Sequence, residues 1–129
     1  MKLKVQHFFD ASHQLPDTDN LITKACARLH GHTYKVIVEV EGENDKGGMI
    51  IDFKAIKQVI DTLDHRHIND IFKQENFIEE ATAENIAKFL YNKIVNELSL
   101  NVLKIAICEG YKGENKASWV IYNNKKYEN

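Results

Sequence analysis

Residues 30–41, HGHTYKVIVEVE, decide the fold that this sequence predicts. Apolar and polar side chains alternate along the stretch, which indicates a β-strand with one buried face. It begins with two histidines separated by one glycine, and side chains two positions apart on a strand point to the same side. The face that we expect to be buried holds His30, His32, Tyr34, Val36, Val38 and Val40.

Residues 2–13 alternate in the same way and predict a second half-buried strand. Its more apolar face carries Leu3, Val5, His7, Phe9, Ala11 and His13. If the two strands pair antiparallel, the end of the first lies beside the start of the second. That register brings His13 next to His30 and His32.

Two helices are predicted downstream of these strands. Asp52 is a good N-cap, and the apolar residues from Phe53 to Leu63 have the spacing of a helix packed on one face. Thr82 can cap a second helix, whose buried stripe runs from Ile86 to Leu98. The stretch between the helices, up to Ala81, shows no clear period and is expected to be irregular.

Strand patterns return toward the C-terminal end. Residues 103–109 and 119–122 predict two further strands, joined by a turn that contains Gly110 and Gly113. The order ββααββ predicts an α+β fold, with a four-stranded, mostly antiparallel sheet and two helices on one face. The length of 129 residues fits a single domain, residues 1–129.

The composition restricts the possible functions. The formal net charge of −2 argues against nucleic acid as the main partner, because such proteins favour a basic face. No run of about 18 apolar residues occurs, so no membrane span is expected. The N-terminus leads straight into a strand pattern, without the apolar core of a signal peptide. We therefore expect a cytoplasmic protein.

Three histidines on converging strand ends predict a metal site. Neutral imidazole is a common zinc ligand, and catalytic zinc sites keep three protein ligands and one open position. A single histidine here is equally well explained as an ordinary hydrogen-bonded side chain. Three that converge by register favour Zn²⁺, with His13, His30 and His32 as ligands.

Cys26 lies in the long aperiodic segment 14–29, just before the second strand. It could complete a closed structural site with the three histidines. Alternatively, its thiolate could act on a substrate as a base or nucleophile beside the metal. The spacing leaves both hypotheses open. The other cysteine, Cys108, lies in a strand pattern and is expected to be a small buried side chain.

Two carboxylates suggest further chemistry. Asp64–His65 follows the first helix and could be an acid–base pair, with the carboxylate orienting the imidazole. A histidine in the last turn of a helix is also explained by the helix dipole. Glu109 continues the apolar face of its strand, where a carboxylate is costly unless it is paired. It could bind an amidine-like group through two parallel hydrogen bonds, or turn to water.

Six motifs occur in order along the chain: Ala11-Ser12-His13, Cys26-x-x-x-His30-Gly31-His32, Ile51-Asp52-Phe53, Leu63-Asp64-His65, Thr82-Ala83-Glu84-Asn85 and Glu109. Together they resemble the 6-pyruvoyl-tetrahydropterin synthase superfamily, and within it the bacterial 6-carboxy-5,6,7,8-tetrahydropterin synthases of queuosine biosynthesis. The short interval between Cys26 and His30 favours this carboxy-forming group, because the pyruvoyl-forming enzymes usually have a longer one.

The resemblance implies a fold, an assembly and residue roles. The fold is the tunnelling fold, whose ββααββ subunits join edge to edge into a barrel, and two trimers stack into a homohexamer with active sites at subunit interfaces. The implied zinc ligands are His13, His30 and His32, and the implied catalytic residues are Cys26, Asp64 and His65. Glu109 would anchor the pterin ring, and Thr82 would line its pocket. From charge and position, Arg28 or Lys24 could meet a triphosphate.

The implied reaction converts 7,8-dihydroneopterin triphosphate to 6-carboxy-5,6,7,8-tetrahydropterin, acetaldehyde and triphosphate. One alternative is a pyruvoyl-forming or related pterin side-chain lyase, and another, of a different class, is a non-catalytic zinc- or pterin-binding protein. The chain departs from the family pattern at Ala81, where a proline is frequent, and at Gly110, where threonine is common. The segment from Tyr111 to Lys116 also looks longer than usual.

Overall fold

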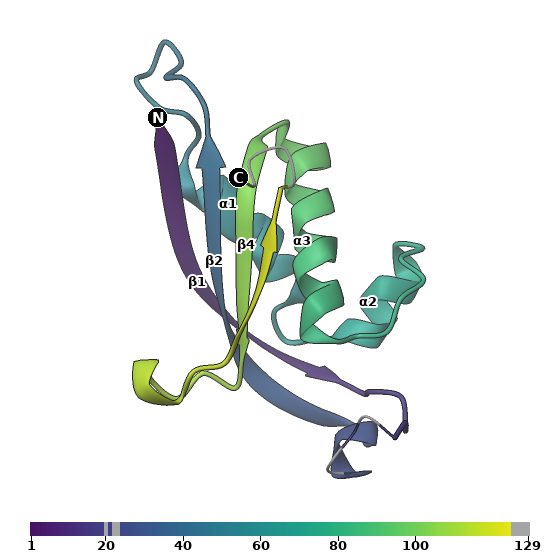
Figure 1. The fold of residues 1–129 in the computed structure, drawn as a ribbon. Coiled ribbons are helices and arrows are strands. Elements are labelled where there is room, and N and C mark those ends of the chain that lie inside the picture. The colour runs from purple at the N-terminus through teal and green to yellow at the C-terminus, as the bar shows by residue number, and fades with distance from the viewer. Residues whose placement is uncertain (20, 22–23, 125–129) are drawn as a thin grey trace.

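The computed structural model describes residues 1–19, 21 and 24–124. In this part of the chain the strands are β1 (Lys2–His13), β2 (His30–Glu41), β3 (Arg66–His67), β4 (Asn101–Glu109) and β5 (Trp119–Asn123). The helices are α1 (Phe53–Ile60), α2 (Ile68–Gln74) and α3 (Ala83–Leu98), and the short 3-10 turns are η1 (Lys24–Ala27), η2 (Asp61–Leu63) and η3 (Glu114–Lys116). The α+β class is confirmed (Figure 1).

β1 and β2 form the antiparallel pair that the alternation predicts. Their pairing runs from Lys2 opposite Glu41 to His13 opposite His30. Both strands have the predicted bounds, and the predicted register is confirmed. In Figure 1 the paired ends near His13 and His30 extend beyond α1 and α3, at the bottom of the view.

The sheet differs from the prediction in its strand number. Within the described residues it has five strands, in the order β3-β1-β2-β4-β5, so the expectation of four is wrong. The other neighbouring pairs are antiparallel, but β3 runs parallel to β1, with Ala11 beside Arg66 and Ser12 beside His67. The sheet is therefore mixed. A strand of two residues is too short to show an alternating pattern, which is why the sequence does not reveal it.

A third helix, α2, lies in the stretch that was expected to be irregular. It buries Ile68, Ile71 and Phe72, which have helical spacing. Its seven residues make fewer than about two turns, and its N-cap residue His67 forms no side-chain capping bond. A helix so short is stabilised by packing rather than by its own propensity, so local signals are weak.

The two predicted helices begin where their caps indicate. The Asp52 side chain accepts a hydrogen bond from the N–H of Lys54 at 2.9 Å, and the Thr82 hydroxyl accepts one from Asn85 at 3.3 Å. α1 and α3 pack on one face of the sheet (Figure 1). The core between these layers includes the fully buried side chains Phe9, Tyr34, Ile60, Leu90, Ile94 and Ile107.

None of the helices in the described ranges has the length and apolar character needed to cross a lipid bilayer.

Candidate metal centre and active-site residues

Three histidines gather where β1 ends and β2 begins. His13 lies opposite His30 in the strand ladder, and His32 lies opposite Ala11. The ring centroids of His13 and His30 are 4.5 Å apart, and His32 lies 5.2 Å from the first and 4.9 Å from the second. One nitrogen of each ring lies within 4.8 Å of the others, which is close enough for all three to bind one ion.

Backbone carbonyls fix the orientation of two of these rings. Nδ1 of His13 lies 2.7 Å from the carbonyl oxygen of Ala81, and Nδ1 of His30 lies 2.6 Å from that of Arg28. A carbonyl oxygen only accepts, so each Nδ1 carries a hydrogen and each Nε2 of a neutral ring presents a lone pair. The two Nε2 atoms are 2.9 Å apart. Lone pairs at this distance repel unless a proton or a metal ion lies between them, so the donor set can hold a metal ion in place of a proton.

Glu109 closes one side of the histidine cluster. Its Oε1 lies 3.1 Å from Nε2 of His13 and 3.5 Å from Nε2 of His32. The hydroxyl of Tyr34 donates a hydrogen bond of 3.4 Å to the same oxygen. The carboxylate is thus paired, as its position on the inner face requires. Because 34% of the side chain is exposed, it can also meet a ligand.

These contacts alter the pKa values of the cluster. Burial lowers the pKa of His13, but the hydrogen bonds to Glu109 and Ala81 outweigh it and raise the pKa overall. The pKa of His32 is lowered, mainly by burial. The hydrogen bond with His13 lowers the pKa of Glu109, against the opposing effect of burial. In the metal-free protein, the His13–Glu109 pair therefore favours a proton on His13.

Cys26 lies in η1, the 3-10 turn just before β2. Its thiol is free and partly buried. Its carbonyl oxygen accepts a hydrogen bond of 3.3 Å from the N–H of Leu15, which ties the turn to the segment after β1. Cys108 is also free, with 1% of its surface exposed, so its predicted burial is confirmed.

The other expected substrate contacts flank the histidines. Arg28 is exposed, and its carbonyl oxygen holds His30. Lys24 is ion-paired with Asp17 at 2.6 Å, which leaves Arg28 as the less engaged cation of the two. Thr82 is partly buried and follows Ala81, whose carbonyl oxygen holds His13.

A second cluster forms after η2, around Asp64 and His65. The Oδ2 of Asp64 lies 2.9 Å from Nδ1 of His65, so the carboxylate and the imidazole are paired. Asp10 binds both residues through its backbone: its N–H donates to Oδ1 of Asp64 at 2.9 Å, and its carbonyl accepts from the N–H of His65 at 2.6 Å. The bond from the Asp10 N–H is the main cause of the lowered pKa of Asp64. These bonds also hold His65 at a φ of 58°, which is uncommon for a residue with a side chain.

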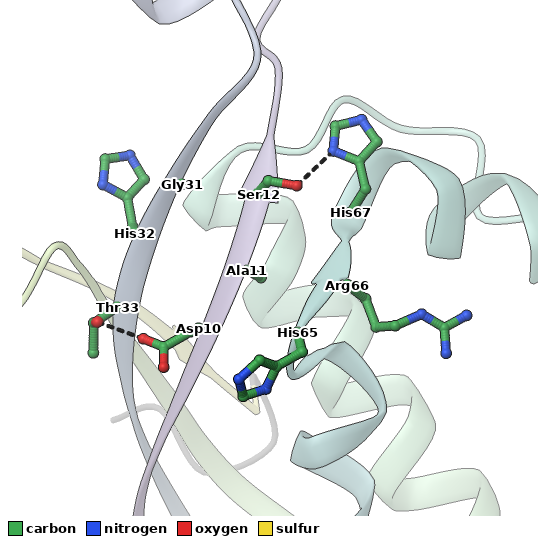
Figure 2. Close-up of a pocket in the computed structure, with 9 residues that line it drawn as sticks. All are labelled: Asp10, Ala11, Ser12, Gly31, His32, Thr33, His65, Arg66 and His67. Carbon is green, nitrogen blue, oxygen red and sulfur yellow. Dashed lines mark hydrogen bonds between the residues drawn. The ribbon is translucent and has the colours of Figure 1, made fainter.

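His65 of this second cluster and His32 of the histidine cluster line the same pocket, which has a volume of about 580 Å³ (Figure 2). The Thr33 hydroxyl donates to the carboxylate of Asp10 in its wall. Nearby, the Ser12 hydroxyl and Nδ1 of His67 are hydrogen-bonded at 2.9 Å. The pocket therefore combines polar groups of β1, β2 and β3.

The histidines belong to the paired ends of β1 and β2, whereas Asp64 and His65 lie at the opposite edge of β1, beside β3, although His32 and His65 line the same pocket. Asp10 and Ala11 are neighbours on the strand, so their side chains point to opposite faces, and His32 shares the face of Ala11. Figure 2 shows His32 and His65 separated by β1 and β2. Among the described residues, no hydrogen bond or ion pair joins Cys26 or the three histidines to the Asp64–His65 pair. One copy of the chain brings the three histidines together beside Glu109 and pairs Asp64 with His65, while the thiol of Cys26 is not among the donor atoms that converge with the histidines.

The sequence did not single out Asp10 or Tyr34. Asp10 lies on the exposed face of a strand, where an acidic residue is ordinary, and its role depends on the short parallel strand β3. Tyr34 was assigned to the buried face. A buried hydroxyl needs a partner. The sequence predicts Glu109 on an inner strand face, where it can accept this hydrogen bond. The need of the buried Tyr34 hydroxyl for an acceptor is therefore the signal that could have identified the Tyr34–Glu109 contact.

Comparisons with known proteins agree with this architecture. The sequence pattern of the family described as 6-pyruvoyl tetrahydropterin synthase matches residues 2–125. The 6-carboxy-5,6,7,8-tetrahydropterin synthase of Haemophilus influenzae is 31% identical over 133 residues, covering 84% of this chain and 92% of that protein. The dihydroneopterin monophosphate aldolase of Pyrococcus furiosus is 32% identical over 117 residues, covering 86% of this chain and 91% of that protein.

A solved structure supports the fold. The 6-pyruvoyl tetrahydropterin synthase of Caenorhabditis elegans superposes with a TM-score of 0.66 at 24% identity, covering 97% of this chain and 96% of that one. The fold, the site and these matches define an enzyme of the pterin side-chain lyase class. The chain belongs to the 6-pyruvoyl tetrahydropterin synthase family, and it is most like the 6-carboxy-5,6,7,8-tetrahydropterin synthases within it.

Proposed function

We propose that the chain is a zinc-dependent lyase that converts 7,8-dihydroneopterin triphosphate to 6-carboxy-5,6,7,8-tetrahydropterin, acetaldehyde and triphosphate, as a cytoplasmic step of queuosine biosynthesis. The observation that carries the proposal is the convergence of three imidazole nitrogens beside the carboxylate of Glu109. The short interval between Cys26 and His30 favours the carboxy-forming reaction.

Zinc is the ion that the three histidines suit best. Neutral imidazole is a favoured zinc ligand, and three such ligands leave a coordination position for substrate. When bound, Zn²⁺ polarises oxygen atoms of the substrate side chain and makes neighbouring protons more acidic. The carbonyls of Ala81 and Arg28 keep two of the ligand rings in the orientation that this requires.

Glu109 is proposed to anchor the pterin ring. A carboxylate can accept parallel hydrogen bonds from the 2-amino group and the neighbouring ring N–H. Its lowered pKa keeps it ionised, which suits an acceptor. Its contact with His13 supports an anchor beside the proposed metal site. Thr82, next to the carbonyl that holds His13, would line the same pocket, and Arg28 would meet the triphosphate.

Proton transfer is assigned to Cys26 and to the Asp64–His65 pair. The thiolate of Cys26 removes a proton from the substrate side chain, and His65 donates or accepts the second one. Asp64 binds Nδ1 of His65, which leaves Nε2 to exchange the proton with the substrate. The movement of protons along the side chain allows triphosphate to leave, and one water molecule then adds as the carbon–carbon bond breaks, supplying the second oxygen of the carboxylate while the other two carbons leave as acetaldehyde.

The separation of the two clusters supports an active site between copies of the chain. The histidines lie where β1 pairs with β2, the Asp64–His65 pair lies at the opposite edge of β1, and within one described chain no hydrogen bond or ion pair joins them. We propose that these single-domain subunits join edge to edge into barrels of three, and that two barrels form a homohexamer. In this assembly the metal group of one subunit meets His65 of its neighbour.

The similarity to a dihydroneopterin monophosphate aldolase favours a second candidate function. An aldolase would cleave the same side chain without rearranging it, and would release a two-carbon aldehyde that keeps the phosphate. The candidate needs the same residues for the pterin ring and for proton transfer. The aldolase candidate differs from the proposed reaction in the number of phosphates on the substrate and in the product.

Product analysis separates the candidates. Zinc-loaded protein is incubated with 7,8-dihydroneopterin triphosphate or monophosphate, and the products are identified by mass spectrometry, with Cys26→Ala as the inactive control. Carboxytetrahydropterin, acetaldehyde and triphosphate support the proposal. A pyruvoyl product from the triphosphate overturns it, and a phosphorylated two-carbon aldehyde from the monophosphate alone establishes the aldolase. Absence of turnover on both substrates excludes both candidates.

A further inference from the structure

The segment 110–118, which follows Glu109 directly, folds over the face of the sheet that the helices leave open. Figure 1 shows this β4–β5 connection in yellow-green, on the side of the sheet away from α3. The segment includes the residues 111–116 that look longer than usual for the family. Its role is not explained by metal binding or proton transfer.

The segment begins with two hydrogen bonds to one acceptor. The N–H groups of Gly110 and Tyr111 both donate to the carbonyl oxygen of Thr33, at 3.0 and 3.2 Å. Gly110 has a φ of 66°, a conformation that favours glycine. A Cβ at this position would lie 3.5 Å from Nδ1 of His32. The chain therefore turns directly beside a proposed metal ligand.

Beyond this turn, aromatic rings surround the ammonium of Lys35. Its Nζ lies 4.4 Å from the ring centroid of Tyr111, 5.8 Å from that of Phe8 and 6.0 Å from that of Trp119. The Tyr111 ring also contacts the other two rings edge-on. Lys35 is 9% exposed, which is low for a lysine. Cation–π attraction stabilises such an arrangement.

Glu114 completes what we name the Lys35 cage, made of Phe8, Lys35, Tyr111, Glu114 and Trp119. Its Oε1 accepts hydrogen bonds from the Tyr111 hydroxyl at 2.7 Å and from Nζ of Lys35 at 3.3 Å. These two contacts lower the pKa of Glu114, so it is ionised at neutral pH. Two residues of the segment are thus attached to a lysine in the middle of the sheet.

The cage and Glu109 occupy opposite faces of the same strand pair. Glu109 lies opposite Tyr34 in the β2–β4 ladder, and Lys35 lies opposite Cys108. Glu109 is the last residue of β4, so the ladder restrains its backbone on one side only. On the other side, the chain is restrained by the turn at Thr33 and then by the cage.

We propose that the Lys35 cage is a positioning device for Glu109, and that it determines how well this carboxylate binds the pterin ring. The inference rests on the proposed role of Glu109 as the pterin anchor. When the cage opens, residues 110–118 move more freely and Glu109 samples orientations in which its two oxygens no longer face the ligand. Lys35 touches neither substrate nor metal and acts through the segment.

The test compares Lys35→Met, which keeps the stem and removes the charge, with Lys35→Arg, which keeps a cation. Tyr111→Phe keeps the ring but removes the bond to Glu114, at a surface position that does not threaten folding. Lys104→Met is the matched control, because Lys104 pairs with Glu39 on the same two strands. The measurements are neopterin affinity by fluorescence, KM and kcat on dihydroneopterin triphosphate, zinc content, and hydrogen exchange of residues 110–118.

For Lys35→Met we expect the neopterin Kd and the KM to rise about threefold to thirtyfold, with zinc content and kcat within about twofold of wild type. Tyr111→Phe should also raise the neopterin Kd and the KM. Lys35→Arg should keep most of the wild-type affinity, and Lys104→Met should leave both the Kd and the KM unchanged. Faster exchange of residues 110–118 without any change of Kd or KM in Lys35→Met and Tyr111→Phe overturns the inference and leaves the cage a purely structural feature. If wild-type protein binds no pterin, the proposed function fails and the inference fails with it.

Discussion

Nε2 of His13 lies 2.9 Å from Nε2 of His30, while Nδ1 of each ring is held by a backbone carbonyl oxygen. The carbonyls leave both rings in the same tautomer, with their basic nitrogens directed at each other. Such a pair is stable when a proton or a metal ion lies at the meeting point. The backbone of two distant segments, at Ala81 and at Arg28, thus prepares the proposed metal site before any ion binds.

Removal of one of these rings is expected to weaken zinc binding strongly. His30→Ala leaves two imidazole ligands, and we expect zinc affinity to fall at least about 100-fold, because even the loss of an outer-shell partner costs 10- to 100-fold. The measurement is competition with a chromophoric zinc chelator. His67→Ala is the control, since His67 bonds to Ser12 in the other cluster. A His30→Ala protein that retains one tightly bound zinc would contradict the assignment.

Metal binding should weaken as the pH falls, because protons compete for the same nitrogens. The raised pKa of His13 means that the folded metal-free protein binds this proton more tightly than the unfolded chain does. The proton stabilises the metal-free fold below the unfolded pKa of about 6.5, and this stabilisation is lost as pH rises through the raised value. Apparent zinc affinity should therefore fall about tenfold per pH unit for each proton displaced.

Calorimetric titrations between pH 5.5 and 8, in buffers of different ionisation enthalpy, count the protons released. Glu109→Gln provides the comparison, because Glu109 raises the pKa of His13. In this variant the pH dependence should move to lower pH. If the pH dependence of zinc affinity is the same in Glu109→Gln and wild type, Glu109 does not stabilise the protonated form of His13.

The strand register of this site was accessible from the sequence because alternation extends over twelve residues in both strands, which fixes His13 against His30. The sequence did not reveal α2 or β3, because a helix of seven residues and a strand of two carry little local signal. The role of Asp10 depends on that short parallel strand, and the Tyr34–Glu109 contact depends on the pairing of β2 with β4. Such contacts between segments distant in sequence are not encoded in any local period.

Asp64→Ala should weaken the fold at neutral pH. The carboxylate accepts hydrogen bonds from the Asp10 N–H and from His65, and its folded pKa is lowered, mainly by the former. A lowered pKa gives stability that is present above the unfolded value of about 3.9 and is lost as pH falls through the folded value. We expect a loss of about 1 kcal/mol at pH 7 that shrinks toward pH 3.

Urea unfolding of the metal-free protein at several pH values measures this effect. Asp19→Asn is the control, because Asp19 is an exposed acid outside the helices and strands. If Asp64→Ala and wild type differ by the same amount at pH 7 and pH 3, the stabilisation does not come from the ionised carboxylate.

Tyr34→Phe should affect pterin binding more than metal binding. The Tyr34 hydroxyl is buried and donates to Glu109, while its ring stacks on Phe9 with centroids 4.8 Å apart. Phenylalanine keeps the stacking and removes only the donor. We expect neopterin affinity to fall about twofold to tenfold, with unchanged zinc content, since one hydrogen bond to a charged group is lost. Equal losses in Tyr91→Phe, whose ring lies against Tyr122, would exclude a specific role.

The separation of Cys26 from the Asp64–His65 pair can be tested by mixing inactive variants. Cys26→Ala and His65→Ala each remove one group of the proposed proton-transfer system, and each should retain zinc, because neither is a proposed ligand. Loss of zinc from Cys26→Ala would instead indicate a closed structural site with four ligands. Each variant alone should lose at least about 100-fold in kcat.

If Cys26 of one subunit works with His65 of a neighbour, unfolding the two variants together and refolding them restores some intact sites. A site is intact when the first subunit carries the His65→Ala lesion and its neighbour carries the Cys26→Ala lesion. In a random mixture of equal parts this happens at about one quarter of the sites, so about a quarter of wild-type activity should return. If both residues act within one chain, every site keeps a lesion and mixing recovers nothing. The activity of the mixture therefore decides whether the two clusters that one chain holds apart become a single site in the assembly.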